Sequence, residues 1–378
     1  MRIAVISMIR DNWGGSEELW YQMAKIALGK NYEVIHLSYK HPNKHPKMQE
    51  LEQLGLQRFI RPSYINKSSN KYIALLQLAK HFIKKKLDKS VSKIFALKPD
   101  IILYNGTCYS IAKEKKLLSY VENYQGNFYI IAHLNSNFFR EINDEEANMV
   151  RQAYNQAKKV FFVSNATLAT AERHLCTSIK NSEIIRNPVN IHQLELLPYP
   201  KNKTINFACV GNLSTVHKGQ DIMFEVLALP KWRNEHWILN VYGSGDDEQY
   251  LKELAIHVGL HNKIIFHGRV ADIKAIWQKN NLLLMPSLME GMPLAVVEAM
   301  LCGRTCLATD VGGNTEWITD NINGFIADAA TIKCLDNALT RAWDKQNEWE
   351  QMGKAAYEKA MQLYNENAGE TLLNKMMN

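Results

Sequence analysis

Short apolar runs alternate with amphipathic stretches along almost the whole chain. In the N-terminal half, runs with the length of buried strands lie at residues 2–8, 32–38, 101–104, 128–133 and 160–163. In the C-terminal half, they lie at residues 205–210, 237–242, 264–266, 282–285, 305–308 and 324–327. Helical spacing of apolar residues follows most of these runs, first at residues 16–28. Such alternation predicts βαβ units and parallel sheets.

Two series of this kind predict an α/β protein with two Rossmann-like, doubly wound domains. A segment with three prolines and no clear periodicity lies between them, and we place the linker at residues 191–203. We therefore expect an N-terminal domain at 1–190, a C-terminal domain at 204–355 and a terminal helix at 356–378 that packs back toward the N-terminal domain. Ligands in such folds bind at the carboxyl ends of the strands, so we expect a cleft between the domains.

The composition is that of a folded globular chain, with 46% hydrophobic and 22% charged residues among 378. No apolar run approaches the ~18 residues of a membrane-spanning helix. The apolar start of the chain is closed by Arg10 and Asp11, without a cleavage pattern. These features predict a cytoplasmic protein.

Charge is distributed unevenly between the two halves. Residues 1–190 hold 28 lysines and arginines against 16 acids, whereas the remainder holds 17 against 22. The segment from Lys71 to Lys98 alone carries eight lysines and one acid along a helical apolar pattern. Such a helix can lie on an anionic membrane surface, or it can be a core helix with a solvated lysine face. Nucleic acid is not an expected partner, because aromatic residues do not alternate with these lysines.

Glycine-rich turns follow strands in both halves. After the first strand, Gly14 and Gly15 precede Ser16 and Glu17, where a tight turn can approach a ligand and a serine can cap the following helix. Neither this turn nor the segment 243–248 has the GxGxxG spacing of a dinucleotide site. A nicotinamide enzyme is therefore not expected.

The segment 286–300 combines an anion site with two carboxylates. Glu290 lies on a loop after a buried strand, Pro293 is placed to open a helix at its first position, and Glu298 falls on that helix. The N–H groups from Gly291 to Leu294 suit a phosphate. Carboxylates beside an anion repel it, so we expect them to accept hydrogen bonds from sugar hydroxyls instead.

Three of these motifs together resemble the family-four retaining glycosyltransferases of GT-B fold. They are EGMPLAVVEAM at the two glutamates, GGSE after the first strand and GNLSTVHKGQD after the first strand of the second half. The resemblance implies that Glu298 holds ribose hydroxyls of a nucleotide-sugar, and that Glu290 holds a hydroxyl of the transferred sugar. It also implies that Lys218 neutralises the diphosphate and that His133 faces the donor sugar.

One departure from the family pattern concerns the diphosphate. Asn212 stands where the family commonly has arginine, which leaves Lys218 alone unless Arg269 or His217 compensates. Losing one charge-assisted contact would slow catalysis about tenfold to a hundredfold. The expected catalytic residues are Glu290, Lys218 and His133. The expected donor-binding residues are Gly14, Gly15, Asn212, Lys218, Arg269, Val270, Glu290, Gly291, Met292, Pro293, Leu294 and Glu298.

The resemblance implies a retaining glycosyltransferase that moves a hexose from a UDP- or GDP-sugar to a glycan or lipid-linked acceptor in polysaccharide or glycoconjugate biosynthesis. The acceptor would bind the N-terminal domain. The chain has no Asp-x-Asp motif, and its six cysteines have no metal-ligand spacing, so we expect no metal and no cofactor. Two alternatives stay open. They are a nucleotide-sugar epimerase of the same shape and a non-catalytic nucleotide-sugar-binding partner subunit.

Overall fold

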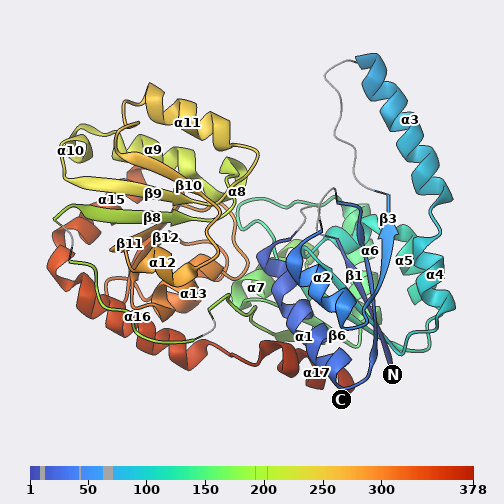
Figure 1. Ribbon diagram of the computed structural model, residues 1–378. Coiled ribbons are helices and arrows are strands. Elements are labelled where there is room, and N and C mark those ends of the chain that lie inside the picture. The colour runs from blue at the N-terminus through green and yellow to red at the C-terminus, as the bar shows by residue number, and fades with distance from the viewer. Residues whose placement is uncertain (9–12, 42–43, 63–70, 192, 202) are drawn as a thin grey trace. The chain divides into compact units, whose positions relative to one another are not determined.

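The computed structural model describes all residues except 9–12, 42–43, 63–70, 192 and 202. The chain divides into two compact units (Figure 1). Unit 1 comprises Met1–Asn135, Arg140–Pro188 and Glu366–Asn378, and unit 2 comprises Ser136–Phe139 and Val189–Asn365. The main division, after Pro188, falls two residues before the expected boundary at 190.

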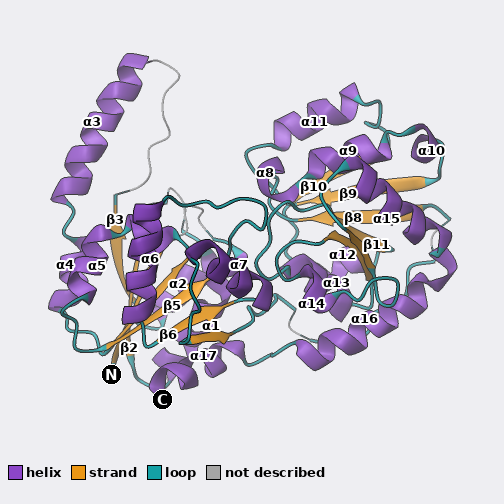
Figure 2. Ribbon diagram, turned by 180° about the vertical axis from the view of Figure 1, so that it is seen from behind, coloured by secondary structure: helices purple, strands orange, loops and turns teal. Residues whose placement is uncertain are grey.

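Unit 1 is built on a seven-stranded parallel sheet in the order β3-β2-β1-β4-β5-β6-β7. Its strands are β1 (Arg2–Ser7), β2 (Glu33–Tyr39), β3 (Gln57–Arg61), β4 (Ile101–Gly106), β5 (Asn127–Ala132), β6 (Lys159–Phe162) and β7 (Ser182–Ile184). Helices cover both faces of the sheet (Figure 2), so its central strands are continuous apolar runs. The two edge strands, β3 and β7, are only partly buried and lack such a run, which is why the apolar pattern does not reveal them.

The helices of unit 1 follow its strands in βαβ order. They are η1 (Gly15–Glu17), α1 (Glu18–Gly29), α2 (Pro46–Gln53), α3 (Lys71–Leu87), α4 (Ser90–Ala96), η2 (Ser110–Lys113), α5 (Lys115–Val121), α6 (Asp144–Gln156), α7 (Asn165–Leu175) and α17 (Ala368–Met377). Helix α6 begins at a capping box, in which Asn143 and Glu146 each accept the other's backbone N–H.

The lysine-rich segment forms two helices with different surroundings. Asp88 separates α3 from α4, because its carboxylate accepts hydrogen bonds from the backbone N–H and hydroxyl of Ser90. In α4, Val91 and Ile94 are buried in the core of unit 1. Helix α3 stands away from the other helices of the unit (Figures 1 and 2). The core-helix alternative is therefore confirmed for α4, whereas α3 exposes several large apolar side chains.

Unit 2 contains a six-stranded parallel sheet in the order β10-β9-β8-β11-β12-β13. Its strands are β8 (Ile205–Val210), β9 (Trp237–Tyr242), β10 (Ile264–Gly268), β11 (Leu282–Met285), β12 (Thr305–Thr309) and β13 (Phe325–Ala327). Its helices are α8 (Thr215–Lys218), α9 (Gln220–Leu227), α10 (Pro230–Arg233), α11 (Glu248–His257), α12 (Ile273–Trp277), α13 (Leu294–Leu301), α14 (Asn314–Trp317), α15 (Ile332–Asp344), η3 (Gln346–Glu348) and α16 (Trp349–Leu363).

A fully buried arginine fixes the linker onto unit 2. The guanidinium group of Arg304 donates to the carbonyl oxygens of Leu197 (3.3 Å), Pro198 (2.6 Å) and Trp277 (2.8 Å). The irregular backbone of the linker thereby obtains partners that a strand or helix would otherwise supply.

The C-terminal end of the chain is shared between the units. The expected boundary at 355 falls inside α16, because one face of that helix, with Trp349, Ala356 and Ala360, is buried in unit 2. The crossing to unit 1 occurs at Glu366, and α17 then packs on α1. The hydroxyl of Tyr129 donates to the carbonyl oxygen of Met376 (2.8 Å), which fixes the last turn of α17 against the sheet.

The close contact between α17 and α1 predicts that a single methyl group added at Gly369 lowers the stability of the protein. A Cβ atom at Gly369 would lie 2.5 Å from Cβ of Gln22 and 2.7 Å from the Met23 nitrogen, so Gly369→Ala must push the helices apart. We expect unfolding free energy to fall by about 1–3 kcal/mol despite the better helix propensity of alanine. The control is Gly29→Ala at the end of α1, where a Cβ atom meets nothing within 4 Å. Equal urea midpoints for the two variants would contradict the packing described here.

Candidate functional site

The order of the strands places a switch point in each sheet, where chain connections leave in opposite directions. In unit 2 this point lies between β8 and β11, and in unit 1 it lies between β1 and β4. Loops after these strands separate there and leave room for a ligand. The expected site residues lie mainly on such loops, and the two units are described in turn.

An ion pair spans the switch point of unit 2. Lys218, at the end of the short helix that follows β8, lies with Nζ 2.5 Å from Oε1 of Glu290, on the loop that follows β11. The same carboxylate oxygen accepts a hydrogen bond from the Ser287 hydroxyl (2.7 Å). Glu290 is only 5% exposed, so its charge depends on these two partners. Two residues that are 72 positions apart thus form one charged centre.

Backbone contacts hold these two loops together. The N–H groups of Leu288 and Met289 both donate to the carbonyl oxygen of His217, at 2.9 and 3.1 Å. Immediately after Lys218, Gly219 adopts φ +60°, and a Cβ atom there would lie 2.3 Å from the carbonyl oxygen of Pro286. Glycine is therefore required for the approach that brings Lys218 to Glu290.

The loop that carries Glu290 is also fixed from the side of β12. A Cβ atom on Gly312, which has φ +52°, would lie 2.0 Å from the carbonyl oxygen of Glu290. The next residue, Gly313, donates its N–H to the carbonyl oxygen of Gly291 (2.9 Å). The Thr309 hydroxyl donates to the carbonyl oxygen of Ser287 (2.5 Å). The position of Glu290 is thus set by loops of three neighbouring strands.

Helix α13 begins directly after this loop. Pro293 is the N-cap, with φ −81° and ψ 83°, and the helix starts at Leu294, so the expectation that Pro293 is its first residue is wrong by one position. Its extended ψ angle keeps Pro293 outside the helix. Met292 and Glu298 are both buried. Pro293 itself makes no side-chain capping hydrogen bond, and the helix start carries the positive end of the helix dipole.

The remaining expected donor residues of unit 2 lie on loops after β8 and β10. Asn212 exposes its side chain, while its carbonyl oxygen accepts a hydrogen bond from the Gln220 amide (2.9 Å). Arg269 is exposed and donates from Nε to the Ser244 hydroxyl (2.7 Å), and Val270 follows it. Lys218 is therefore the cation that contacts Glu290, and Arg269 points to a different loop.

In unit 1, the expected glycine turn leads into a buried polar network. Gly14 is the N-cap of the turn of 3₁₀ helix Gly15–Glu17. Oε1 of Glu17 accepts hydrogen bonds from the Ser7 hydroxyl (2.9 Å) and from the side-chain amide of Asn105 (2.8 Å). Burial raises the pKa of Glu17 to about 7, against the opposing effect of these hydrogen bonds.

The network continues to His133, directly after β5. Its Nε2 lies 2.7 Å from Oδ1 of Asn105, and its Nδ1 lies 3.4 Å from the side-chain amide nitrogen of Asn187. Burial lowers the pKa of His133 to about 3, so the imidazole is neutral at physiological pH. His133 therefore carries no positive charge at physiological pH and cannot act there as an imidazolium acid.

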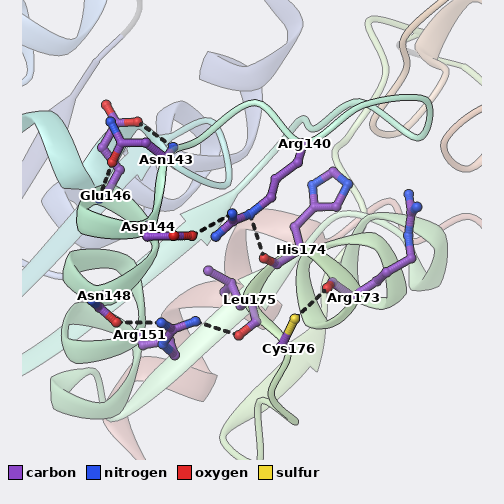
Figure 3. Close-up of polar contacts among 10 residues, drawn as sticks. All are labelled: Arg140, Asn143, Asp144, Glu146, Asn148, Arg151, Arg173, His174, Leu175 and Cys176. Carbon is purple, nitrogen blue, oxygen red and sulfur yellow. Dashed lines mark hydrogen bonds and ion pairs between the residues drawn. The ribbon is translucent and has the colours of Figure 1, made fainter.

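Beyond His133, the chain re-enters unit 1 at Arg140. Figure 3 shows the polar contacts of this arginine. Its guanidinium group donates to Asp144 (2.7 Å) and to the carbonyl oxygen of His174 (3.1 Å), so it joins α6 to the end of α7. Arg151 makes a parallel connection to the carbonyl oxygen of Leu175 (2.6 Å). These contacts anchor one end of the loop that follows His133.

The sequence singles out most of these residues but misses the ones that position them. Lys218 and Glu290 come together, while Gly14, Gly15 and His133 belong to unit 1. Ser287, Ser7 and Asn105 were not expected. A signal exists for Asn105, because a polar residue ends the apolar run of β4, at the carboxyl end where ligands bind.

The described part of the chain contains neither a metal-binding cluster nor a helix that could cross a membrane. Within it, no group of three or more histidine, cysteine or acidic side chains is arranged to hold a metal ion. None of its helices combines the length and the hydropathy needed to span a bilayer.

Comparison with known proteins agrees with this geometry. Residues 198–359 match the family described as glycosyl transferases group 1. The crystal structure of HepE from Anabaena in complex with UDP and glucose has a TM-score of 0.74 at 18% identity, and the match covers all of this chain and 99% of HepE. The two parallel-sheet units therefore have the GT-B fold, as the sequence predicts.

Two curated relatives share part of the sequence. An uncharacterized glycosyltransferase from Haemophilus influenzae is 30% identical over 177 residues, which are 46% of this chain and 49% of the relative. The lipopolysaccharide 1,6-galactosyltransferase from Salmonella typhimurium is 27% identical over 169 residues, 43% and 46% of the two chains. The matched region thus spans about half the length of these relatives. The match to the glycosyl transferases group 1 family covers residues 198–359, which lie in unit 2.

The buried carboxylate of unit 1 predicts a pH dependence of stability. The pKa of Glu17 is raised from 4.5 to about 7, so the folded state binds a proton more tightly than the unfolded state. The extra stability of the folded state is complete below pH 4.5. As the pH rises through 7, the free energy of unfolding falls by about 3 kcal/mol. We expect Glu17→Gln to lack this loss when urea unfolding is measured at pH 5 and pH 8. A variant with the same pH slope as the wild type would contradict the burial of an ionisable Glu17.

Proposed function

We propose that this protein is a retaining, metal-independent hexosyltransferase that uses a UDP- or GDP-sugar and a glycan or lipid-linked acceptor in polysaccharide or glycoconjugate biosynthesis. The observation that carries the proposal is the Lys218–Glu290 pair at the switch point of the group 1 domain. Support comes from HepE, whose structure holds UDP and glucose, and from the lipopolysaccharide galactosyltransferase. The epimerase and the binding subunit remain the alternatives to be tested.

When the nucleotide-sugar binds, Lys218 would exchange its partner Glu290 for the diphosphate group. A diphosphate carries more negative charge than one carboxylate, so it would draw the Lys218 ammonium group away from Glu290. Lys218 then stabilises the charge that develops on the leaving diphosphate. Glu290, still held by the Ser287 hydroxyl, is left to accept a hydrogen bond from a sugar hydroxyl.

The start of α13 would supply the second source of positive potential. Amide groups from Gly291 to Leu294 lie at the positive end of the helix dipole and would bind phosphate or sugar oxygens. Glu298, in the second turn, would accept hydrogen bonds from ribose hydroxyls, as the family resemblance implies. Arg269 and Val270, after β10, are assigned to the nucleotide.

Catalysis without a metal follows from this set of groups. Lys218 and the start of α13 provide positive charge where a divalent cation would otherwise act. His133 is assigned to the donor sugar by the family resemblance, and Gly14 and Gly15 are assigned to donor binding. Retention would follow if the departing phosphate accepted the proton of the acceptor hydroxyl on the same face of the sugar.

A nucleotide-release assay separates the three functions. With a panel of UDP- and GDP-hexoses, a transferase releases the nucleoside diphosphate as the hexose passes to an acceptor hydroxyl or, more slowly, to water. An epimerase converts the sugar without release, and a binding subunit does neither. We expect Glu290→Gln to lower release at least about tenfold without weakening nucleotide binding, because the sugar contact is lost while Lys218 remains. The control is Glu253→Gln, on the exposed face of α11.

The same assay tests metal independence. We expect full activity in excess chelator. Activity that is lost in chelator and restored by manganese would contradict the proposed role of Lys218. Release that survives unchanged in Glu290→Gln would contradict the role of the carboxylate.

We also propose that α3 attaches the protein to an anionic membrane surface, where a lipid-linked acceptor is found. Four large apolar side chains of α3 are exposed: Leu75 (66%), Leu76 (62%), Ile83 (59%) and Leu87 (70%). The last three, spaced by seven and four residues, share one face of the helix. Helix α3 carries five lysines and no acid. An exposed apolar stripe with basic flanks matches the interface of a lipid bilayer.

Sedimentation with vesicles tests this attachment. We expect binding to phosphatidylcholine vesicles that contain phosphatidylglycerol at low salt, and at least about tenfold weaker binding for Leu76→Ser/Ile83→Ser. The matched control is Ile256→Ser/Ile322→Ser, which removes exposed apolar groups from unit 2. Absence of binding, or equal loss in both double variants, would contradict the role of α3. Nucleotide release is measured on the same samples, so failure of attachment is distinguishable from loss of activity.

A further inference from the structure

A chain of hydrogen bonds crosses the switch point of unit 1. It begins at Ser7 on β1, passes through Glu17 and reaches Asn105 at the end of β4. From Asn105 it continues to His133 after β5, and His133 also contacts Asn187. All five side chains are buried, so the hydrogen bonds define their mutual orientation. The carboxylate of Glu17 has no place in the activity proposed above.

The acceptors around Asn105 fix the direction of its amide. Its Nδ2 lies 2.8 Å from Oε1 of Glu17 and 3.3 Å from the carbonyl oxygen of Ser16, and both of these oxygens accept hydrogen bonds. The amide nitrogen must therefore face Glu17, and the amide oxygen must face His133. Because a carbonyl oxygen only accepts, Nε2 of His133 must carry the proton.

The second ring nitrogen of His133 is then an acceptor. The imidazole is neutral, so a proton on Nε2 leaves a lone pair on Nδ1. The amide of Asn187 lies 3.4 Å from Nδ1, whereas Asn105 lies 2.7 Å from Nε2. The longer contact is the weaker one. A substrate hydroxyl can replace it without disturbing the contact to Asn105.

We propose that Glu17 is a positioning residue for His133. Through Asn105, it holds the imidazole proton on Nε2 and so presents Nδ1 as the acceptor for a hydroxyl of the substrate. This inference rests on the proposed function, in which His133 contacts the donor sugar. Glu17 itself touches no substrate in this scheme. Glu17 acts on His133 through two hydrogen bonds, one between Glu17 and Asn105 and one between Asn105 and His133.

The surroundings of Glu17 make its effect depend on pH. It is faced by the Ser7 hydroxyl from β1, the Asn105 amide from β4, and Trp20 and Glu18 from α1. Glu18 is a negative neighbour, and it pairs with Lys47 (2.5 Å). Burial, and to a smaller extent Glu18, raises the pKa of Glu17 to about 7 against the lowering effect of the hydrogen bonds. The ionised Glu17 carboxylate makes a charge-assisted hydrogen bond to Asn105. This bond is about twice as strong as the hydrogen bond that the neutral carboxyl group makes.

The tautomer of His133 can be observed without any assay of activity. In protein with ¹⁵N-labelled histidine, the resonance lost in His133→Gln identifies the residue, and nitrogen shifts separate protonated from unprotonated ring nitrogens. We expect the wild type to carry the proton on Nε2 at pH 8, and Asn105→Ala to lose this preference. A wild-type spectrum with the proton on Nδ1 would overturn the inference. So would an unchanged tautomer in Asn105→Ala.

The pH profile of nucleotide release tests the role of the charge. Glu17→Gln resembles the protonated side chain, so we expect kcat/KM close to that of the wild type at pH 6. At pH 8.5 the wild type should exceed the variant about fivefold to tenfold, through kcat, with unchanged UDP affinity. The control is Glu253→Gln, on the exposed face of α11 in unit 2, which removes a carboxylate far along the chain from Glu17. Parallel profiles for wild type and Glu17→Gln would overturn the inference, whereas absent release in the wild type would instead refute the proposed function.

Discussion

The pairing of Lys218 with Glu290 is the interaction on which the site of unit 2 depends. A carboxylate that is 5% exposed must be neutralised by a close partner, because an isolated buried charge costs several kcal/mol. The structure meets this demand by joining the loops after β8 and β11, the two strands that flank the switch point. The glycines at 219 and 312 allow the close backbone contacts that the ion pair needs. The position of the charged centre is therefore a consequence of the strand order.

The two units place different chemical groups at their switch points. In unit 2, an ammonium group, a carboxylate and a helix start provide separated charges, which suit an anion with hydroxyl groups attached. In unit 1, a hydroxyl, an amide, a carboxylate and a neutral imidazole form a hydrogen-bonded chain. Such a chain orients groups without providing strong positive potential. The uneven net charge of the two halves does not reveal this difference, because much of the positive charge of unit 1 lies on α3 and α4.

Much of the fold was predictable because parallel sheets leave a strong apolar pattern. Strands β8, β9 and β11 have the bounds that the apolar runs indicate. The edge strands β3 and β7 were not found, because a half-exposed strand needs no continuous apolar run. The lysine-rich segment was expected to be one helix. Its interruption at Asp88 depends on local hydrogen bonds from Ser90 to the Asp88 carboxylate, which helical periodicity does not report.

The site was predictable in its residues but not in its contacts. Glu290 and Lys218 were both expected, yet they were assigned to different ligand groups and their pairing was not foreseen. That pairing results from backbone contacts among distant loops, such as those to the carbonyl oxygen of His217. The glycine turn was expected to contact a ligand, whereas the role of Glu17 depends on Asn105, which is 88 positions away. Roles of single residues in donor binding stay predictions.

Calorimetric titration with UDP of the wild type, Lys218→Met, Glu290→Gln and the double variant tests the exchange of partners most directly. If a diphosphate competes with Glu290 for Lys218, then Lys218→Met weakens UDP binding at least about tenfold, whereas Glu290→Gln strengthens it about threefold to tenfold. In the double variant, the gain from Glu290→Gln disappears, because no ammonium group remains to be released. Weaker binding in Glu290→Gln, or unchanged binding in Lys218→Met, would contradict the account.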